Sequence, residues 1–137
     1  PYRYGVLLLA DGDRMGELLD KAKTQNEHQT ITQALSNFAG QVAHTMRKNR
    51  GHCIYAGGDD VLGFVPLNTA YDCADSLQQL FASSLKDVAK TLGVEEEKSP
   101  TLSVGIAICQ CGIPSVSHFQ ENSSGFIRKR KHNLSFS

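Results

Sequence analysis

The sequence predicts an α+β fold in which helices cover one face of an antiparallel sheet. Apolar runs of strand length open and close the patterned part of the chain, and two long segments between them carry apolar residues at helical spacing. A Gly-Gly-Asp-Asp turn joins two further short apolar runs, as in a hairpin. The pattern ends near residue 109. We therefore expect one domain over residues 1–109, followed by an irregular, poorly ordered basic tail over residues 110–137.

The composition limits the possible partners. The chain has 137 residues, enough for one core of moderate size, and its 14 Lys and Arg balance its 14 Asp and Glu. No overall basic field therefore favours nucleic acid, and no apolar run is long enough to span a bilayer, so no membrane partner is expected. The four cysteines lack zinc-site spacing, which predicts reduced thiols in a cytoplasmic protein. The first residue is Pro, so we expect a piece of a longer protein or a processed product.

The first patterned segment is the apolar run Tyr4–Ala10, which is typical of a central strand. Asp11, Gly12 and Asp13 follow it directly, at the end of the strand where sheet-based active sites are usually built. The alternative is that Asp-Gly forms a turn and Asp13 caps the next helix. Apolar residues at helical spacing over 15–22 predict that helix.

A polar segment and a long helix come next. Lys23–Gln29 predicts a loop or a break, and the Thr-x-x-Gln pattern that starts at Thr30 has the shape of a capping box. Gly51 predicts the helix end, and the three cations at residues 47, 48 and 50 complement the helix dipole there. Contacts with phosphate are the alternative role for these cations. The apolar stripe of this helix consists of Ile31, Leu35, Phe38, Ala39, Val42 and Met46.

The two short strands Cys53–Ala56 and Val61–Pro66 flank the sequence Gly57-Gly58-Asp59-Asp60. The connection is short enough for an antiparallel hairpin. Two adjacent carboxylates at its tip repel each other unless a cation, or a ligand that carries cations, neutralises them. The turn is therefore a candidate metal site.

The last two elements are a helix and a strand. Thr69 has a capping-box-like position, and the stripe from Ala70 to Leu92 predicts a long helix. Thr101–Cys109 alternates as a strand does, with Ser103 and Gly105 on the less apolar phase. A glycine inside a strand indicates close approach of another backbone or a ligand, and we take Ser103 as a candidate nucleotide contact.

The resulting order β-α-β-β-α-β is that of the ferredoxin-like fold. Its first strand lies beside its third, so Asp11 and the Asp59-Asp60 pair are expected to converge. Carboxylate oxygens without His or Cys favour Mg²⁺ or Mn²⁺, and two such ions would support an in-line phosphoryl displacement. Gly57 and Gly58 would leave the backbone open to a triphosphate, and the carbonyl of Gly12 is a further hard ligand.

These motifs together resemble a known family. Asp-Gly-Asp after the first strand, Gly-Gly-Asp-Asp in the hairpin and Ser-Val-Gly-Ile-Ala-Ile in the last strand are similar to the palm domain of GGDEF nucleotide cyclases and of the large subunit of type III CRISPR effector complexes. Val-Leu-Gly-Phe-Val-Pro-Leu after the hairpin, and Leu-Leu-Leu-Ala-Asp-Gly-Asp-Arg-Met-Gly before it, resemble the CRISPR subunit more closely, in its type III-B form. The resemblance covers residues 4–109.

The resemblance implies metal-dependent synthesis of cyclic oligoadenylates from ATP in antiviral defence, switched on when the complex binds target RNA. Partners would be ATP and the other subunits, with crRNA and target RNA bound through the complex. Asp11, Asp59 and Asp60 would be catalytic and, with the Gly12 carbonyl, would hold Mg²⁺ or Mn²⁺. Gly57, Gly58, Gly12 and Ser103 would bind the nucleotide. For Asp13, a metal role and a capping role both stay open.

Two other functions fit the same motifs, namely a GGDEF-type diguanylate cyclase and a non-catalytic module for ATP binding or assembly. The first is disfavoured because Asp-Asp-Val stands where that family has Asp/Glu-Glu-Phe. The chain also departs from the CRISPR family after the last strand. Ile113-Pro114 lies where an aromatic-Pro-Leu motif and an amphipathic helix usually follow, which suggests a truncation or an altered reading frame.

Overall fold

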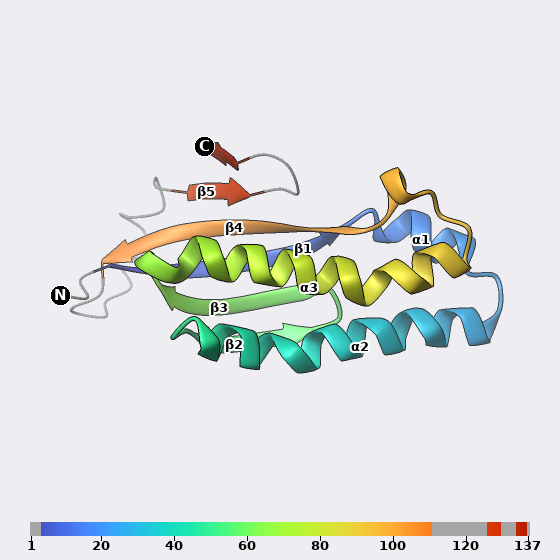
Figure 1. The fold of residues 1–137 in the computed structure, drawn as a ribbon, viewed down its shortest axis with the longest axis horizontal. Coiled ribbons are helices and arrows are strands. Elements are labelled where there is room, and N and C mark those ends of the chain that lie inside the picture. Colours follow the sequence, from blue (N-terminus) through green and yellow to red (C-terminus); the bar gives the residue numbers. More distant parts are fainter. Residues whose placement is uncertain (1–3, 111–125, 130–133, 137) are drawn as a thin grey trace.

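A computed structural model describes residues 4–110, 126–129 and 134–136 (Figure 1). The strands form one sheet in the order β2-β3-β1-β4-β5-β6, and all neighbours in it are antiparallel. The predicted α+β class and the βαββαβ order are confirmed, and α2 and α3 lie across the same face of the sheet (Figure 1). The elements are β1 Tyr4–Asp13, α1 Met15–Lys21, α2 Gln25–Lys48, β2 His52–Gly57, β3 Asp60–Pro66, η1 Leu67–Thr69, α3 Ala70–Thr91, η2 Glu96–Lys98, β4 Thr101–Gln110, β5 Phe126–Lys129 and β6 Leu134–Phe136.

Strand β1 is central and has a hydrogen-bonded neighbour on each side. Leu8 lies opposite Gly63 of β3 and Ile106 of β4. The strand continues beyond the apolar run because pairing with β4 extends to Asp13, which lies opposite Thr101. The acidic motif after the apolar run is therefore held in the sheet and is not a free turn.

The core lies between the sheet and the two long helices. Side chains alternate across β1, so Leu8 is fully buried under the helices while Leu9 is 43% exposed on the other face. Phe38 of α2 and Phe81 of α3 meet edge to face, with ring centroids 5.0 Å apart and planes at 83°. Within the described part of the chain, this packing covers one face of the sheet and leaves the opposite face open.

The start of α2 differs from the prediction. Thr24 is the N-cap, because its hydroxyl accepts a hydrogen bond from the Glu27 backbone at 3.2 Å, and the Glu27 carboxylate accepts one from the Thr24 backbone at 3.1 Å. Thr30, the predicted cap, instead donates to the carbonyl of Asn26 within the helix at 2.9 Å. The predicted loop or break over residues 23–29 is present but shorter: residues 22–24 separate α1 from α2, and this reciprocal cap starts the helix at Gln25.

Replacing Thr24 by Ala should lower the free energy of unfolding by about 1 kcal/mol, because the first turn of α2 loses its cap. The Thr24 hydroxyl also lowers the pKa of Glu27, so the difference between the two proteins should shrink as pH falls through that lowered pKa. Urea unfolding across a pH series measures both effects. The matched variant Thr30→Ala should leave stability nearly unchanged. If it lost as much stability as Thr24→Ala, the helix would have to start at Thr30 instead.

Thr69 also differs from its predicted role. It is the N-cap residue of α3 but makes no side-chain bond to the helix backbone. Its hydroxyl donates instead to the carbonyl of Asn49 at 2.6 Å. Thr69 therefore ties the start of α3 to the end of α2.

The predicted irregular tail over residues 110–137 differs from the structure at β5 and β6. These two strands extend the sheet beyond β4, whose last residue is Gln110. The Ile113-Pro114 departure and the second half of the basic run over residues 128–131 lie outside the described residues. Among the helices that the structure describes, none combines the length and the apolar character needed to cross a membrane.

Candidate metal and nucleotide site

Three carboxylates meet where β1 ends beside the β2–β3 hairpin. Asp11, Asp59 and Asp60 each offer one oxygen, and these oxygens all lie within 4.8 Å of one another. The register brings them together, because Ala10, the residue before Asp11, lies opposite Val61, the residue after Asp60. The predicted convergence of the two acidic motifs is thus present in the structure. We call these three residues the acidic cluster.

The hairpin turn consists of Gly58 and Asp59, since Gly57 and Asp60 are the last paired residues. Gly58 has φ +59°, in the left-handed region that glycine adopts at little cost. A positive φ at the first of two turn residues is typical of a type II′ hairpin. The sequence Gly-Asp at this turn therefore places Asp59 at the hairpin tip.

Gly12 allows the hairpin tip to lie against β1. A Cβ atom on Gly12 would stand 2.8 Å from both Cβ and Oδ2 of Asp59, and 3.1 Å from Cζ of Phe81. At Gly57 a Cβ atom would stand 2.6 Å from the hydroxyl oxygen of Tyr55. Both glycines thus make room for neighbouring side chains of the site.

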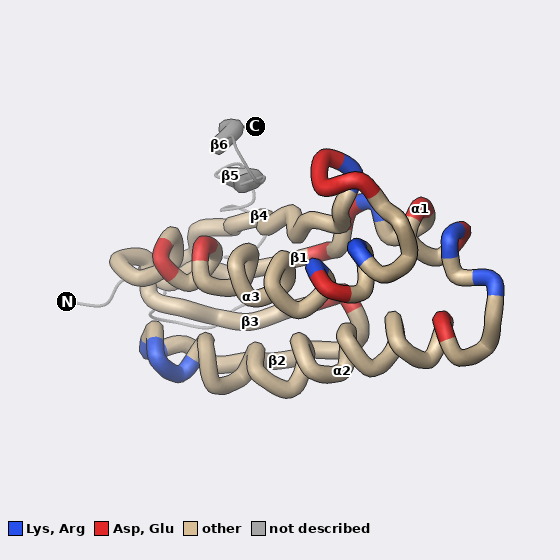
Figure 2. The backbone as a smooth tube through the Cα atoms, turned by 45° about the vertical axis from the view of Figure 1, so that its right-hand side comes forward, with Lys and Arg blue, Asp and Glu red and all other residues tan. Residues whose placement is uncertain are grey.

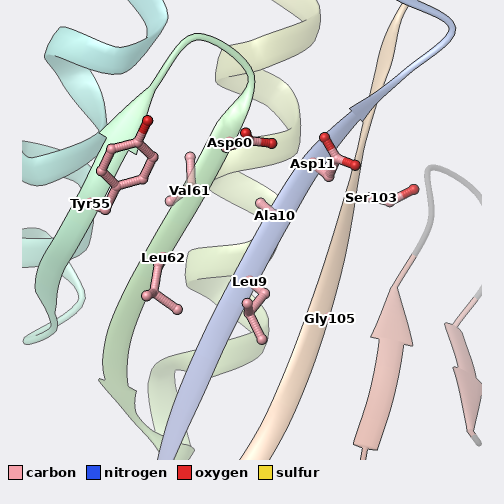
Figure 3. A pocket seen from close by; sticks show the side chains of 9 residues that line it. All are labelled: Leu9, Ala10, Asp11, Tyr55, Asp60, Val61, Leu62, Ser103 and Gly105. Carbon is pink, nitrogen blue, oxygen red and sulfur yellow. The ribbon is translucent and has the colours of Figure 1, made fainter.

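A cavity of about 370 Å³ lies on the open face of the sheet, next to the acidic cluster (Figure 3). Asp11 and Asp60 stand at one end of it, and the helices lie behind the sheet on the other side (Figure 3). A β-bulge between Cys53 and Tyr55 shifts the register of β2. Tyr55, which follows the bulge, borders the cavity. The lining residues are Leu9, Ala10, Asp11, Tyr55, Asp60, Val61, Leu62, Ser103 and Gly105.

The lining contains residues that the sequence analysis did not select. Leu9 and Leu62 belong to the strand alternation, which could have marked them as the face opposite the core. Tyr55 depends on the bulge, for which the sequence carries no signal. Ser103 and Gly105, which the sequence analysis did single out, lie in the wall of the cavity.

Asp13 has a partner other than the one its position suggested. It does not cap α1, whose N-cap is Arg14 with a left-handed φ of 65°. Its carboxylate instead accepts a hydrogen bond from the hydroxyl of Ser103. Arg14 in turn donates to the backbone carbonyl of Glu97. Two side-chain bonds therefore tie the end of β1 to β4 and to η2, which precedes it.

The acidic cluster favours a bound cation. Partial burial, a hydrogen bond with Asp60 and the negative charges of Asp60 and Asp13 raise the pKa of Asp11, against the lowering effect of the Gly12 backbone. A divalent cation would relieve this repulsion. The donors of the cluster are all carboxylate oxygens, the ligands preferred by Mg²⁺ and Mn²⁺, so the residues fit the expected metals.

The basic residues 47, 48 and 50 lie elsewhere. Arg47 and Lys48 end α2 and Arg50 lies two residues beyond it, whereas the hairpin is at the far end of β2 (Figure 2). Their position agrees with their predicted role at the helix terminus. It separates them from the acidic cluster by the length of a strand.

Asp11→Asn should stabilise the metal-free protein at pH 7 by on the order of 0.5 kcal/mol, the scale of exposed charge pairs. Because the pKa of Asp11 is raised on folding, the folded state holds the proton more tightly, and stability falls as pH rises from the ordinary value of 3.8 through the raised pKa. The gain from Asp11→Asn should therefore vanish at low pH. Urea unfolding with a chelator present measures it, with the exposed Asp87→Asn as the matched control. A native chain more stable than Asp11→Asn at pH 7 would contradict the repulsion.

Comparisons with known proteins match the chain to one family. The family model of the second palm domain of Cas10/Cmr2 matches residues 3–134. The chain is 30% identical over 112 residues to the CRISPR system Cmr subunit Cmr2 of Pyrococcus furiosus, an alignment that covers 64% of the chain. The chain spans only 13% of the length of that relative.

Solved structures of nucleotide cyclases share the fold. The adenylyl cyclase CyaB from P. aeruginosa matches 98% of this chain and 64% of its own, with a TM-score of 0.56 and 12% identity. The guanylyl cyclase Cya2 matches 98% of this chain and 62% of its own, with a TM-score of 0.53 and 14% identity. The GGDEF domain of YfiN from Pseudomonas aeruginosa matches 88% of this chain and 71% of its own, with a TM-score of 0.50 and 20% identity.

Proposed function

Because the chain belongs to the family of the second palm domain of Cas10/Cmr2, we propose that it is the metal-dependent nucleotidyltransferase palm of a type III CRISPR effector complex. Its product would be cyclic oligoadenylates made from ATP. The observation that carries the proposal is the acidic cluster, with oxygens within 4.8 Å of one another, beside a cavity of about 370 Å³. A nucleotidyl-cyclase-like palm with carboxylates at this position is suited to phosphoryl transfer.

The proposed roles follow from position. Asp11, Asp59 and Asp60, with the carbonyl of Gly12, would hold Mg²⁺ or Mn²⁺, which when bound neutralises phosphate charge and promotes ionisation of an attacking hydroxyl. The apolar side chains of the cavity would receive the nucleoside, because ligand sites combine an apolar surface with a few polar groups. Its end beside Asp11 and Asp60 would then receive the phosphates.

The remaining nucleotide contacts of the proposal lie around that end. Gly57, the last paired residue of β2, and Gly58 of the turn lie beside the acidic cluster, where backbone without side chains can approach phosphates closely. Gly12 supplies backbone at the facing position on β1, and Ser103 lines the same cavity. Together these residues would orient the triphosphate for in-line attack.

In the proposed reaction the 3′-hydroxyl oxygen of one ATP attacks the α-phosphorus of another. A phosphodiester bond forms, the bond from the α-phosphorus to the bridging oxygen breaks, and pyrophosphate leaves with that electron pair. Asp60 belongs to the acidic cluster and also lines the cavity, so its carboxylate is placed to orient the hydroxyl and to receive its proton.

The proposal also concerns the complex in which the domain acts. Since the chain matches a small part of a Cmr subunit, we place it in a cytoplasmic ribonucleoprotein with other Cmr-type subunits. Binding of crRNA and target RNA by that complex would switch the activity on. An isolated palm is expected to have little activity, because such sites usually require a second nucleotide surface from another domain.

Product analysis tests the proposal and its alternatives. The parent complex with target RNA, and separately this chain, would be incubated with ATP or GTP and Mg²⁺ or Mn²⁺, and the products identified by mass spectrometry. Cyclic oligoadenylates from the complex are expected. Cyclic dinucleotides of guanosine would support a diguanylate cyclase instead. ATP binding without product in either setting would overturn catalysis and leave an ATP-binding or assembly module.

A further inference from the structure

Ser103 is the one polar side chain among the described residues that is buried, with 4% of its surface exposed. A buried hydroxyl needs a hydrogen-bond partner, and this one donates to the carboxylate of Asp13. Bonds from a hydroxyl to a charged carboxylate are stronger than bonds between neutral groups. The orientation of Asp13 is therefore set by a side chain of the neighbouring strand.

The register makes this bond unexpected. Ser103 lies directly opposite Asp11 in the β1–β4 ladder, while Asp13 lies opposite Thr101. The hydroxyl thus bonds diagonally across the ladder, to the residue two positions beyond its pair. Asp11 and Asp13 point to the same face of β1, because alternate residues of a strand share a face.

Asp13 nevertheless stays outside the acidic cluster. Among the described residues the group that could hold a metal contains Asp11, Asp59 and Asp60 only. A cation bound beside Asp11 would attract a second carboxylate on the same face, two residues away. The carboxylate of Asp13 accepts a hydrogen bond from Ser103 of β4 instead.

We propose that Ser103 is a positioning residue that holds the Asp13 carboxylate away from the acidic cluster, so that three carboxylates, not four, face a divalent cation. The inference rests on the proposed function for the presence of the metal. Mg²⁺ and Mn²⁺ sites that act on nucleotides use few carboxylates and complete their ligands with phosphate oxygens. Keeping Asp13 away leaves a coordination position for the nucleotide.

The inference predicts two opposite effects of one substitution. In Ser103→Ala the Asp13 carboxylate is free to join the cluster, so Mn²⁺ alone should bind about five- to ten-fold more tightly through the added charged ligand. ATP should bind the Mn²⁺-loaded protein more weakly, because Asp13 occupies the position meant for phosphate and the Ser103 hydroxyl of the proposed nucleotide site is lost. If the substitution only disordered the site, the chain would bind both Mn²⁺ and ATP more weakly.

Three further variants isolate the contact. Ser103→Thr keeps the hydroxyl and should bind Mn²⁺ as the native chain does. Asp13→Asn removes the charge, and adding Ser103→Ala to it should change Mn²⁺ affinity no further, as expected when one substitution acts only through the other residue. Circular dichroism of each variant confirms folding.

Electron paramagnetic resonance of free Mn²⁺ measures these affinities on the 137-residue chain without any turnover, and a fluorescent ATP analogue measures nucleotide binding. Tighter Mn²⁺ binding by Ser103→Ala that disappears in the Asp13→Asn background would establish the inference. If the native chain binds Mn²⁺ and Ser103→Ala leaves this affinity unchanged or lowers it, the inference about Ser103 is overturned. The proposed function is not affected by that result. A native chain that binds no Mn²⁺ would overturn the metal site, and both proposals with it.

Discussion

Replacing both Asp59 and Asp60 by Ala in the intact complex should lower the initial rate of cyclic nucleotide synthesis by about 100-fold or more, the scale of removing charge stabilisation from a transition state. The two substitutions remove two of the three carboxylates of the acidic cluster. Asp11 alone cannot hold a divalent cation against water, because single carboxylates bind Mg²⁺ weakly. Initial rates with radiolabelled ATP, at saturating target RNA, measure the loss.

Protein stability separates this effect from unfolding. The two side chains are part of a cluster of like charges, so their removal should leave the metal-free melting temperature equal or higher. Asp87→Asn, an exposed carboxylate on α3, should keep the native rate. Synthesis that survives the double substitution would defeat the catalytic role of the hairpin.

Gly12→Ala should lower the free energy of unfolding by about 1–3 kcal/mol, the usual cost of overpacking. The added methyl group would stand 2.8 Å from Cβ of Asp59, an atom next to the backbone that cannot rotate away. The hairpin tip must therefore move away from β1. We also expect weaker Mn²⁺ binding, because Asp59 would be displaced from Asp11.

Gly40→Ala is the matched control, since nothing lies within 4 Å of a Cβ atom at this helical position. Alanine favours helix by about 1 kcal/mol over glycine, so this variant should be more stable and should bind Mn²⁺ unchanged. Chemical denaturation and Mn²⁺ titration of both variants give the comparison. Equal stability of Gly12→Ala and the native chain would mean that the hairpin does not rest on β1.

The strand order and the meeting of the acidic motifs could be predicted from the sequence. Apolar runs of strand length and two helical stripes were enough to indicate βαββαβ, and this topology alone places Asp11 beside the Asp59-Asp60 turn. The start of α2 was mistaken because two Thr-based patterns compete. Thr24 with Glu27 forms the cap, whereas Thr30 lies inside the helix.

Contacts that cross between strands could not be predicted. The bond from Ser103 to Asp13 depends on which way two side chains turn within a register that the sequence does not specify. Tyr55 reaches the cavity only after a bulge in β2, which shifts every later residue of the strand by one position. Local patterns carry no information on either feature.

The position of β1 has a consequence for the way the site opens. Amides of β1 are bonded on both sides, whereas β2 stands at the end of the sheet order and carries one half of the hairpin. Hydrogen exchange should therefore be slow at β1 and faster at β2, through local opening that separates Asp59 and Asp60 from Asp11. A cation that binds only the closed arrangement would slow exchange at β2 and leave β1 unchanged. The metal would then stabilise the hairpin in its position against β1.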